Sequence, residues 1–93
     1  MSEEISSSRA TSGGGVQWDA AATIDARGLR CPQPLLAMRR ALREEPAGRL
    51  VRVLATDPGS WRDFHSFAEL SGQPLLRAEC IDGEFRYWLL ATT

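Results

Sequence analysis

Apolar residues recur along the chain at two different spacings, and each spacing predicts its own kind of element. Partly alternating, β-rich runs predict strands at Ala22–Ala26 and Leu50–Ala55, the second of them central in its sheet. Between these runs, apolar residues spaced three or four apart predict a helix from Pro32 to about Glu44. The residues of its apolar stripe are Leu35, Leu36, Met38, Ala41 and Leu42.

A second helix is predicted after a turn at residues 57–60. Ser60 is expected to cap its N-terminus, with Asp63 as an acidic residue in the first turn and Gly72 at its end. The apolar residues that recur at helical spacing, and that we expect in the core, are Trp61, Phe64, Phe67 and Ala68.

The C-terminal part of the chain predicts a β-hairpin. Asp82-Gly83, a dipeptide typical of two-residue hairpin turns, separates the strand-like runs Leu75–Ile81 and Glu84–Ala91. The element order is then βαβαββ. This order predicts an α+β fold, a two-layer α/β sandwich in which two helices cover one face of a four-stranded mixed sheet.

Composition divides the chain into a tail and one domain. Residues 1–17 are rich in Ser, Gly and Glu, and their apolar residues are too scattered to pack, so we expect a disordered N-terminal tail. Residues 18–93 are expected to form a single domain with one modest core. The tail lacks the apolar stretch of a signal peptide, and no run is long enough to span a membrane. We therefore expect a cytoplasmic protein without membrane contact.

The charge of the predicted domain is balanced. Beyond the tail, 10 Arg stand against 10 acidic residues, whereas nucleic-acid-binding domains usually carry a clear basic excess. Direct nucleic-acid binding is therefore not expected. The chain contains no Lys, which excludes a mechanism built on a lysine nucleophile or a Schiff base.

The most informative stretch is Gly28-Leu29-Arg30-Cys31-Pro32-Gln33-Pro34, where the first predicted strand gives way to the first helix. Pro32 suits the first helical position, because the N–H that proline lacks has no partner there. Cys31 is thus expected to cap the helix N-terminus, where unpaired amides and aligned peptide dipoles favour a thiolate.

Neighbouring residues modify the predicted reactivity of this thiol. Arg30 adds positive charge, whereas the two prolines leave Gln33 and Leu35 as the amide donors of the first turn. We expect a moderately activated thiol whose pKa falls from about 8.5 to about 7. Free cysteines are more often small core residues, but the flanking arginine and prolines make an apolar slot a poor fit for Cys31.

Structural roles are expected for the other reactive side chains. Cys80 lies in an apolar, strand-like run and is interpreted as a core residue, although the cysteine count also allows a disulfide with Cys31. His65, the one histidine, is expected at the surface rather than beside Cys31. Two distant cysteines and one histidine cannot supply the usual ligands of a zinc site, so no metal is expected.

Three arginines gather on the polar side of the first predicted helix. Arg39, Arg40 and Arg43 are interpreted as a solvated face with favourable charge near the helix C-terminus. The alternative is a docking surface for an acidic partner.

Over about residues 23–91 the chain resembles the TusA/SirA family of small sulfur-carrier proteins. The resemblance is carried by residues 25–34, with Cys-Pro-x-Pro following Gly-Leu-x, by Leu54–Ser60 and by Arg62-Asp63. It implies a sandwich of a four-stranded mixed sheet and two helices, in agreement with the predicted element order. Many relatives read Arg-Asp-Ile-Pro in the second helix, where this chain has His65 in place of Pro. A cysteine often found three residues later is Ala68 here, and both departures bear on partner identity more than on sulfur transfer.

The resemblance also implies a chemistry. Cys31 would carry a covalent persulfide, taken from a cysteine desulfurase or a rhodanese-like donor and handed to the thiol of an acceptor protein. In the family, such transfer serves tRNA wobble-uridine thiolation, molybdenum-cofactor assembly and the oxidation of sulfur compounds. The exchange needs no metal, oxyanion hole or general base, and no cofactor besides the persulfide is expected.

Residue roles follow from the same resemblance. Arg39 and Asp57 match positions that contribute to partner docking in the family. The motif residues that support Cys31 are Gly28, Leu29, Arg30, Pro32, Gln33 and Pro34.

Two other functions remain open at this point. The predicted fold resembles the C-terminal domain of translation initiation factor three, which admits an interaction or regulatory module with RNA contacts and an incidental Cys31. The neutral charge of the domain argues against that function. A redox sensor or peroxidase-like thiol is the second alternative, and it would need Cys80 as a resolving partner.

Overall fold

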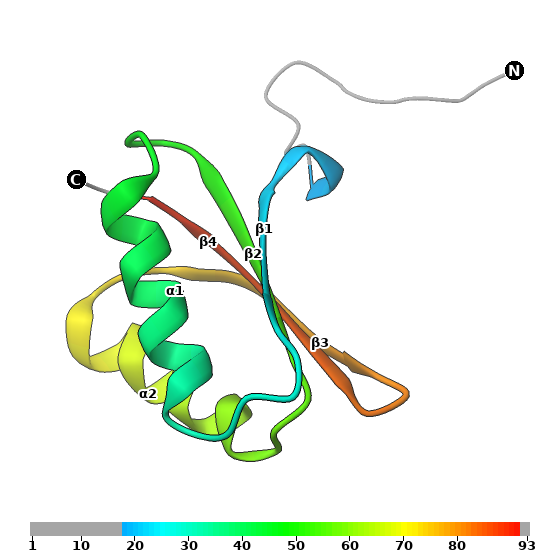
Figure 1. Cartoon of the computed structure of the whole chain (residues 1–93). Helices are drawn as coiled ribbons and strands as arrows, with labels where there is room; N and C mark the ends of the chain where they lie inside the picture. The colour runs from blue at the N-terminus through cyan, green and yellow to red at the C-terminus, as the bar shows by residue number, and fades with distance from the viewer. Residues whose placement is uncertain (1–17, 92–93) are drawn as a thin grey trace, which may run out of the picture.

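The computed structural model describes residues 18–91 (Figure 1). After a short 3₁₀ turn, η1, the strands and helices alternate in the predicted βαβαββ order. Their bounds are η1 (Trp18–Ala20), β1 (Ala22–Ala26), α1 (Gln33–Glu44), β2 (Leu50–Ala55), α2 (Gly59–Ser71), β3 (Leu75–Ile81) and β4 (Glu84–Leu90). The predicted tail at residues 1–17 and the last residues of the predicted domain, 92–93, lie outside the described residues.

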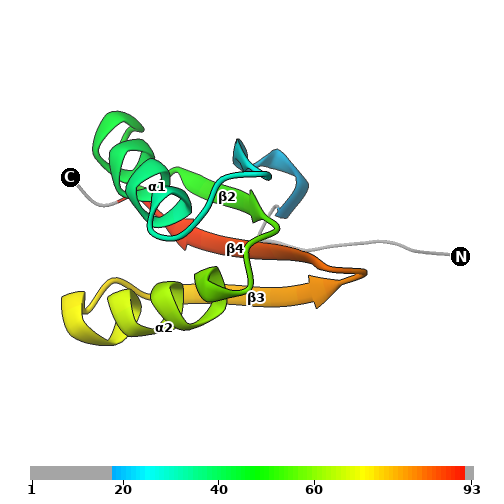
Figure 2. The ribbon, with the colours of Figure 1, turned by 60° about the horizontal axis from the view of Figure 1, so that its bottom comes forward.

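A single mixed sheet of 4 strands, in the order β1-β2-β4-β3, forms one layer. β1 runs parallel to β2, with Ala26 opposite Ala55 at its end, and β4 runs antiparallel to both of its neighbours. Both helices cover the same face, α1 over β1 and β2 and α2 over β3 and β4 (Figure 2). The predicted two-layer α+β sandwich is confirmed.

The core lies between the helices and the face of the sheet that they cover. Alternate residues of β2 point toward the helices, so Val51, Val53 and Ala55 are fully buried. Phe64 of α2 stacks on Tyr87 of β4, with 4.1 Å between the ring centroids. The hairpin turn is also as predicted, since Asp82 and Gly83 both have positive φ angles.

The start of α2 differs from the prediction. The helix begins at Gly59 without a side-chain cap, and Ser60 is instead buried with its hydroxyl oxygen 2.8 Å from the Tyr87 hydroxyl oxygen. A buried hydroxyl needs a hydrogen-bond partner, and the phenol supplies it. The end of the helix is as predicted, because Gly72 is left-handed, with φ +76°, and its N–H donates to the Ala68 carbonyl.

Each helix buries less of its apolar stripe than predicted. Phe64 is fully buried and Phe67 partly buried, whereas Trp61 is 39% exposed. On α1, Met38 is fully buried but Leu36 is 52% exposed. A helix buries only the face that it turns toward the sheet, and these two exposed side chains lie beyond the edges of that face.

Cys80 is exposed, so its interpretation as a core residue is wrong. β3 is an edge strand, and the hairpin that it forms with β4 extends beyond the helices (Figures 1 and 2). Cys80 pairs with Phe85 in this projecting part. An apolar run at a sheet edge therefore does not place each of its residues in the core.

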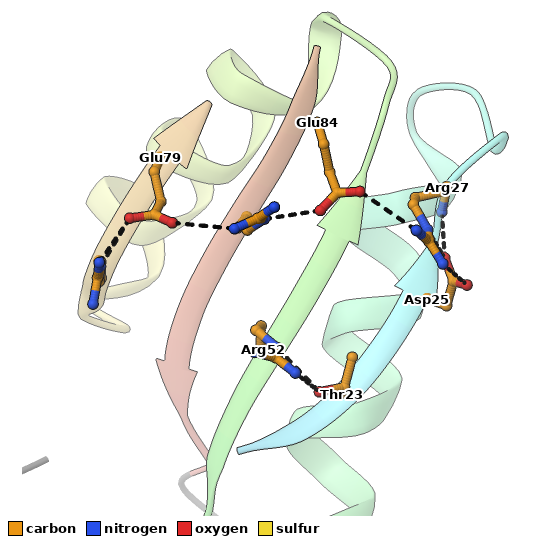
Figure 3. Close-up of polar contacts among 8 residues, drawn as sticks. Thr23, Asp25, Arg27, Arg52, Glu79 and Glu84 are labelled. Atoms are coloured by element: carbon orange, nitrogen blue, oxygen red, sulfur yellow. Dashed lines mark hydrogen bonds and ion pairs between the residues drawn. The ribbon is translucent and has the colours of Figure 1, made fainter. Parts of the chain in front are cut away.

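On the sheet face opposite the helices, ion pairs link three of the strands (Figure 3). Arg27 donates two hydrogen bonds to Asp25 and lowers the pKa of that carboxyl to about 2. Successive partners, joined by nitrogen–oxygen distances from 2.8 to 3.7 Å, are Asp25, Arg27, Glu84, Arg86, Glu79 and Arg77. Acidic and basic groups alternate, so this network has no basic excess.

We predict that Tyr87, the only tyrosine of the chain, ionises unusually late in the folded protein. Loss of solvation on burial raises its pKa to about 12, although the hydrogen bond with Ser60 lowers the pKa. In an absorbance titration, the tyrosinate signal should rise near pH 12 in the native chain and near pH 10 in the urea-unfolded chain. Because folding raises this pKa, the stabilising contribution is complete below about pH 10 and is lost as the pH rises toward 12.

Circular dichroism over the same pH range serves as the control for that titration. A tyrosinate midpoint near pH 10 in a chain that keeps its native spectrum would contradict the buried environment of Tyr87.

Candidate functional site

The candidate site lies where the loops that follow β1 and β2 meet. Because these strands are adjacent and parallel, their C-terminal ends share one edge of the sheet, and the two loops lie side by side (Figure 1). The Gly28 N–H donates to Thr56 Oγ1 at 3.0 Å, and the Cys31 N–H donates to Asp57 Oδ2 at 3.1 Å. These two hydrogen bonds fix the backbone of one loop to side chains of the other.

Two glycines permit this close approach. Gly28 has φ +83°, a left-handed conformation that glycine adopts without strain. Gly59 is the first residue of α2, and a Cβ at this position would lie 3.0 Å from Asp57 Oδ2 and 3.4 Å from Cys31 Cβ. The missing side chain therefore lets α2 begin directly beside Cys31.

Cys31 is a free, exposed cysteine at this junction. α1 begins at Gln33 with Pro32 as its N-cap residue, so Cys31 precedes the cap that it was predicted to form. The Cys31–Pro32 peptide bond is cis. The thiol donates a hydrogen bond to the Asp63 carboxylate of α2.

Of the two amides that were expected to favour a thiolate, those of Gln33 and Leu35, the one nearer to Cys31 already has a partner. The Cys31 N–H binds Asp57, and the Gln33 N–H donates to the Arg30 carbonyl at 2.7 Å. The two prolines of the motif have no N–H. Residues 31–34 therefore offer the sulfur no free backbone donor.

The electrostatic environment of Cys31 overturns the predicted fall in its pKa. The hydrogen bond to Asp63 raises the pKa of the thiol above its ordinary value, and loss of solvation acts in the same direction. The negative charges of Asp63 and Asp57 raise this pKa further, whereas Arg62 opposes them with the smallest effect. Carboxylates from the neighbouring loop and helix thus outweigh the positive polarisation expected at a helix start.

A groove between α1 and α2 adjoins the site. Its volume is about 410 Å³. We call it the interhelical groove, and its lining residues are Leu35, Arg39, Asp63, Ser66, Phe67, Leu70 and Ser71. Asp63 belongs to both features, because it lines the groove and accepts the hydrogen bond from Cys31.

Comparison with known proteins identifies the family. The family model described as "Sulfurtransferase TusA" matches residues 22–90. The chain belongs to the TusA family. It is 40% identical over 68 residues to the sulfur carrier protein TusA of Pseudomonas syringae pv. syringae (strain B728a), covering 73% of this chain and 81% of that one.

A second TusA relative and a solved structure agree with this assignment. The sulfur carrier protein TusA of Allochromatium vinosum is 39% identical over 64 residues, which cover 69% of this chain and 84% of that one. The crystal structure of a SirA-like protein from Desulfitobacterium hafniense has 30% sequence identity and a TM-score of 0.65. This structural match covers 77% of this chain and 99% of that one.

Burial separates the residues of the TusA-like motif into two groups. Pro34 is buried and anchors the start of α1 in the core. The residues of the motif that lie at the surface with Cys31 are Gly28, Leu29, Arg30, Pro32 and Gln33. Asp57 is partly buried at the site, whereas Arg39 lies on α1 in the interhelical groove.

His65 lies at the surface, as predicted. Its Nδ1 is 2.7 Å from the Trp61 carbonyl oxygen, one turn earlier in α2, and its ring lies against the Trp61 ring. Among the described residues, His, Cys, Asp and Glu side chains form no group of three or more that could hold a metal ion. Within residues 18–91, no helix has the length and apolarity needed to cross a membrane.

Two site residues, Thr56 and Asp63, have roles that the sequence analysis did not assign. Thr56 directly follows β2, and the parallel pairing of β1 with β2 is the signal that places it beside Gly28. Asp63 was interpreted as a helix-start acid, but α2 begins earlier and turns this side chain toward Cys31.

We predict that Asp57 stabilises the site through its contact with the Cys31 N–H. Asp57→Ala should lower the free energy of unfolding by about 1 kcal/mol, because the amide loses its acceptor. Asp57→Asn should cost less, since its side-chain carbonyl can still accept this hydrogen bond. Urea denaturation measures both changes.

The matched control for the Asp57 variants is Glu69→Ala, which removes an exposed acid of α2 and should change stability by less than about 0.5 kcal/mol. Equal stability of Asp57→Ala and the unmodified chain would contradict the structural role of Asp57.

Proposed function

We propose that this member of the TusA family carries sulfur as a persulfide on Cys31. The observation that carries the proposal is the placement of a free, exposed thiol at the junction of two loops, inside the Cys-Pro-x-Pro motif. An exposed sulfur on a fixed backbone is accessible to the reactive cysteine of another protein, as thiol exchange requires.

The proposed loading step is a sulfur exchange between two cysteines. The Cys31 sulfur attacks the outer sulfur of a donor persulfide, so that a new S–S bond forms on Cys31 as the donor's S–S bond breaks. The proton of the Cys31 thiol is released, and the donor cysteine leaves as a thiolate that takes up a proton. In the unloading step, an acceptor thiolate attacks the outer sulfur of Cys31, and Cys31 returns to the thiol. Both steps need no external oxidant or reductant.

The proposed partners are a cysteine desulfurase or a rhodanese-like protein as donor and a protein thiol as acceptor. The interhelical groove beside Cys31 supports docking of a protein segment, because it combines an apolar lining with the positive charge of Arg39. One of its lining residues, Leu70, is 87% exposed. An exposed apolar side chain in a groove is typical of protein-interaction surfaces.

The two alternative functions have less support. On the sheet face opposite the helices, three arginines pair with three acids, and among the described residues only Arg52, which binds Thr23, has no acidic partner there (Figure 3), so RNA phosphates would find little net positive charge. A redox mechanism needs Cys80 to resolve Cys31, but both cysteines are free and Cys80 lies on the projecting hairpin.

We predict that Cys31 alone accepts sulfur. Incubation with a cysteine desulfurase and cysteine should add the mass of one sulfur atom to the intact chain, and reduction should remove it. Cys31→Ser should gain nothing, because it lacks the accepting sulfur, whereas Cys80→Ser should load like the unmodified chain. Mass spectrometry gives the readout.

Sulfur found on the Cys31→Ser chain would overturn the proposed carrier function. A Cys31–Cys80 disulfide formed in preference to a persulfide would favour the redox alternative.

We also predict that Arg39 contributes to partner docking. Arg39→Ala should weaken binding of the sulfur donor or acceptor by about tenfold, or ~1.4 kcal/mol, because arginines in interface centres often contribute this much. Calorimetric titration with the purified partner measures the change. The matched control is Arg49→Ala, an exposed arginine in the loop between α1 and β2 that does not line the interhelical groove. Equal affinities of the two variants would contradict the docking role.

A further inference from the structure

Asp63 has no role in the proposed sulfur exchange between cysteines. Its carboxylate accepts the hydrogen bond of the Cys31 thiol and also lines the interhelical groove. The side chain is partly buried, on the side of α2 that faces the loop after β1. A single acidic side chain therefore connects the reacting sulfur with the proposed docking surface.

The charged and titratable groups around this contact come from five parts of the fold. The loop after β2 contributes Asp57, which holds the Cys31 backbone, and α2 contributes Arg62, which opposes the carboxylates. β4 contributes Tyr87, whose hydroxyl is engaged with Ser60.

Two more arginines lie close to the sulfur or to its carboxylate partner. Arg30 immediately precedes Cys31 and is exposed, and Arg39 of α1 shares the interhelical groove with Asp63. The Cys31 thiol donates its hydrogen bond to the Asp63 carboxylate, so the thiol is in direct contact with a negatively charged group.

We propose that Asp63 is a positioning residue that keeps Cys31 as a protonated, hydrogen-bonded thiol in the unloaded carrier, and that this contact restricts the loading step to the complex with a docked sulfur donor. The inference rests on the proposed carrier function, because it concerns the regulation of the same cysteine. Thiolates, not thiols, attack sulfur–sulfur bonds and alkylating reagents. A thiol bound to a carboxylate is therefore protected from small electrophiles while no partner is present.

The place of Asp63 in the interhelical groove suggests how a partner could release the thiol. A partner segment that enters the interhelical groove meets the same carboxylate that accepts the thiol hydrogen bond. A hydrogen-bond donor on that segment would bind Asp63 in place of the Cys31 thiol. The Cys31 proton is then free to leave for solvent, and the thiolate that attacks the donor persulfide forms next to the donor.

The test is the pH dependence of Cys31 alkylation by iodoacetamide in a Cys80→Ser background. Asp63→Asn removes the negative charge and nearly preserves the shape of the side chain. We expect the midpoint of its pH–rate profile to move to lower pH. The rate at pH 7 should rise about threefold for each unit of that shift, because the tenfold larger thiolate fraction is partly offset by the lower nucleophilicity of a less basic thiolate. Glu69→Gln, on an exposed part of α2, should leave the profile unchanged.

A profile for Asp63→Asn that coincides with the unmodified one, or that moves to higher pH, overturns the proposal. Asp63→Ser, which also removes the charge, replaces Asp63→Asn if circular dichroism shows that the latter does not fold. Desulfurase loading of the unmodified chain is measured separately. Absent loading would refute the carrier function, whereas the alkylation profiles decide the role of Asp63.

Discussion

The hydrogen bonds between the loop after β1 and the loop after β2 are the constraint on which the sulfur site depends. Gly28 and Cys31 donate from one loop, and Thr56 and Asp57 accept from the other. The parallel pairing of β1 with β2 brings both loops to one edge of the sheet, and each loop leads into a helix on the same face. The position of Cys31 is therefore a property of the whole βαβα unit rather than of its own motif.

This tertiary setting reverses the local electrostatics of the thiol. Considered alone, the start of α1 predicts an activated thiolate, because peptide dipoles and Arg30 favour negative charge. In the folded chain, the amides of residues 31–34 are occupied or replaced by proline, and Asp63 and Asp57 lie next to Cys31. A sulfur carrier that meets its partners one at a time benefits from a thiol that is unreactive between encounters.

The sequence predicts most of the fold because the relevant signals are local. The strand and helix periodicities, the hairpin at Asp82-Gly83 and the helix end at Gly72 need only neighbouring residues, and all are confirmed. Cys80 was misplaced because the apolar character of a strand does not reveal whether a helix covers it. Asp63 was misassigned because its partner is 32 residues away in the sequence.

The most direct test of this account is the ionisation of Cys31 itself, followed by thiolate absorbance in the Cys80→Ser chain. The titration is compared between the native chain and the same chain unfolded in urea, so that each protein serves as its own reference. The native chain should show its midpoint at higher pH, because the hydrogen bond to Asp63 and the negative charges of Asp63 and Asp57 disfavour the thiolate. A midpoint at lower pH in the native chain would contradict this expectation.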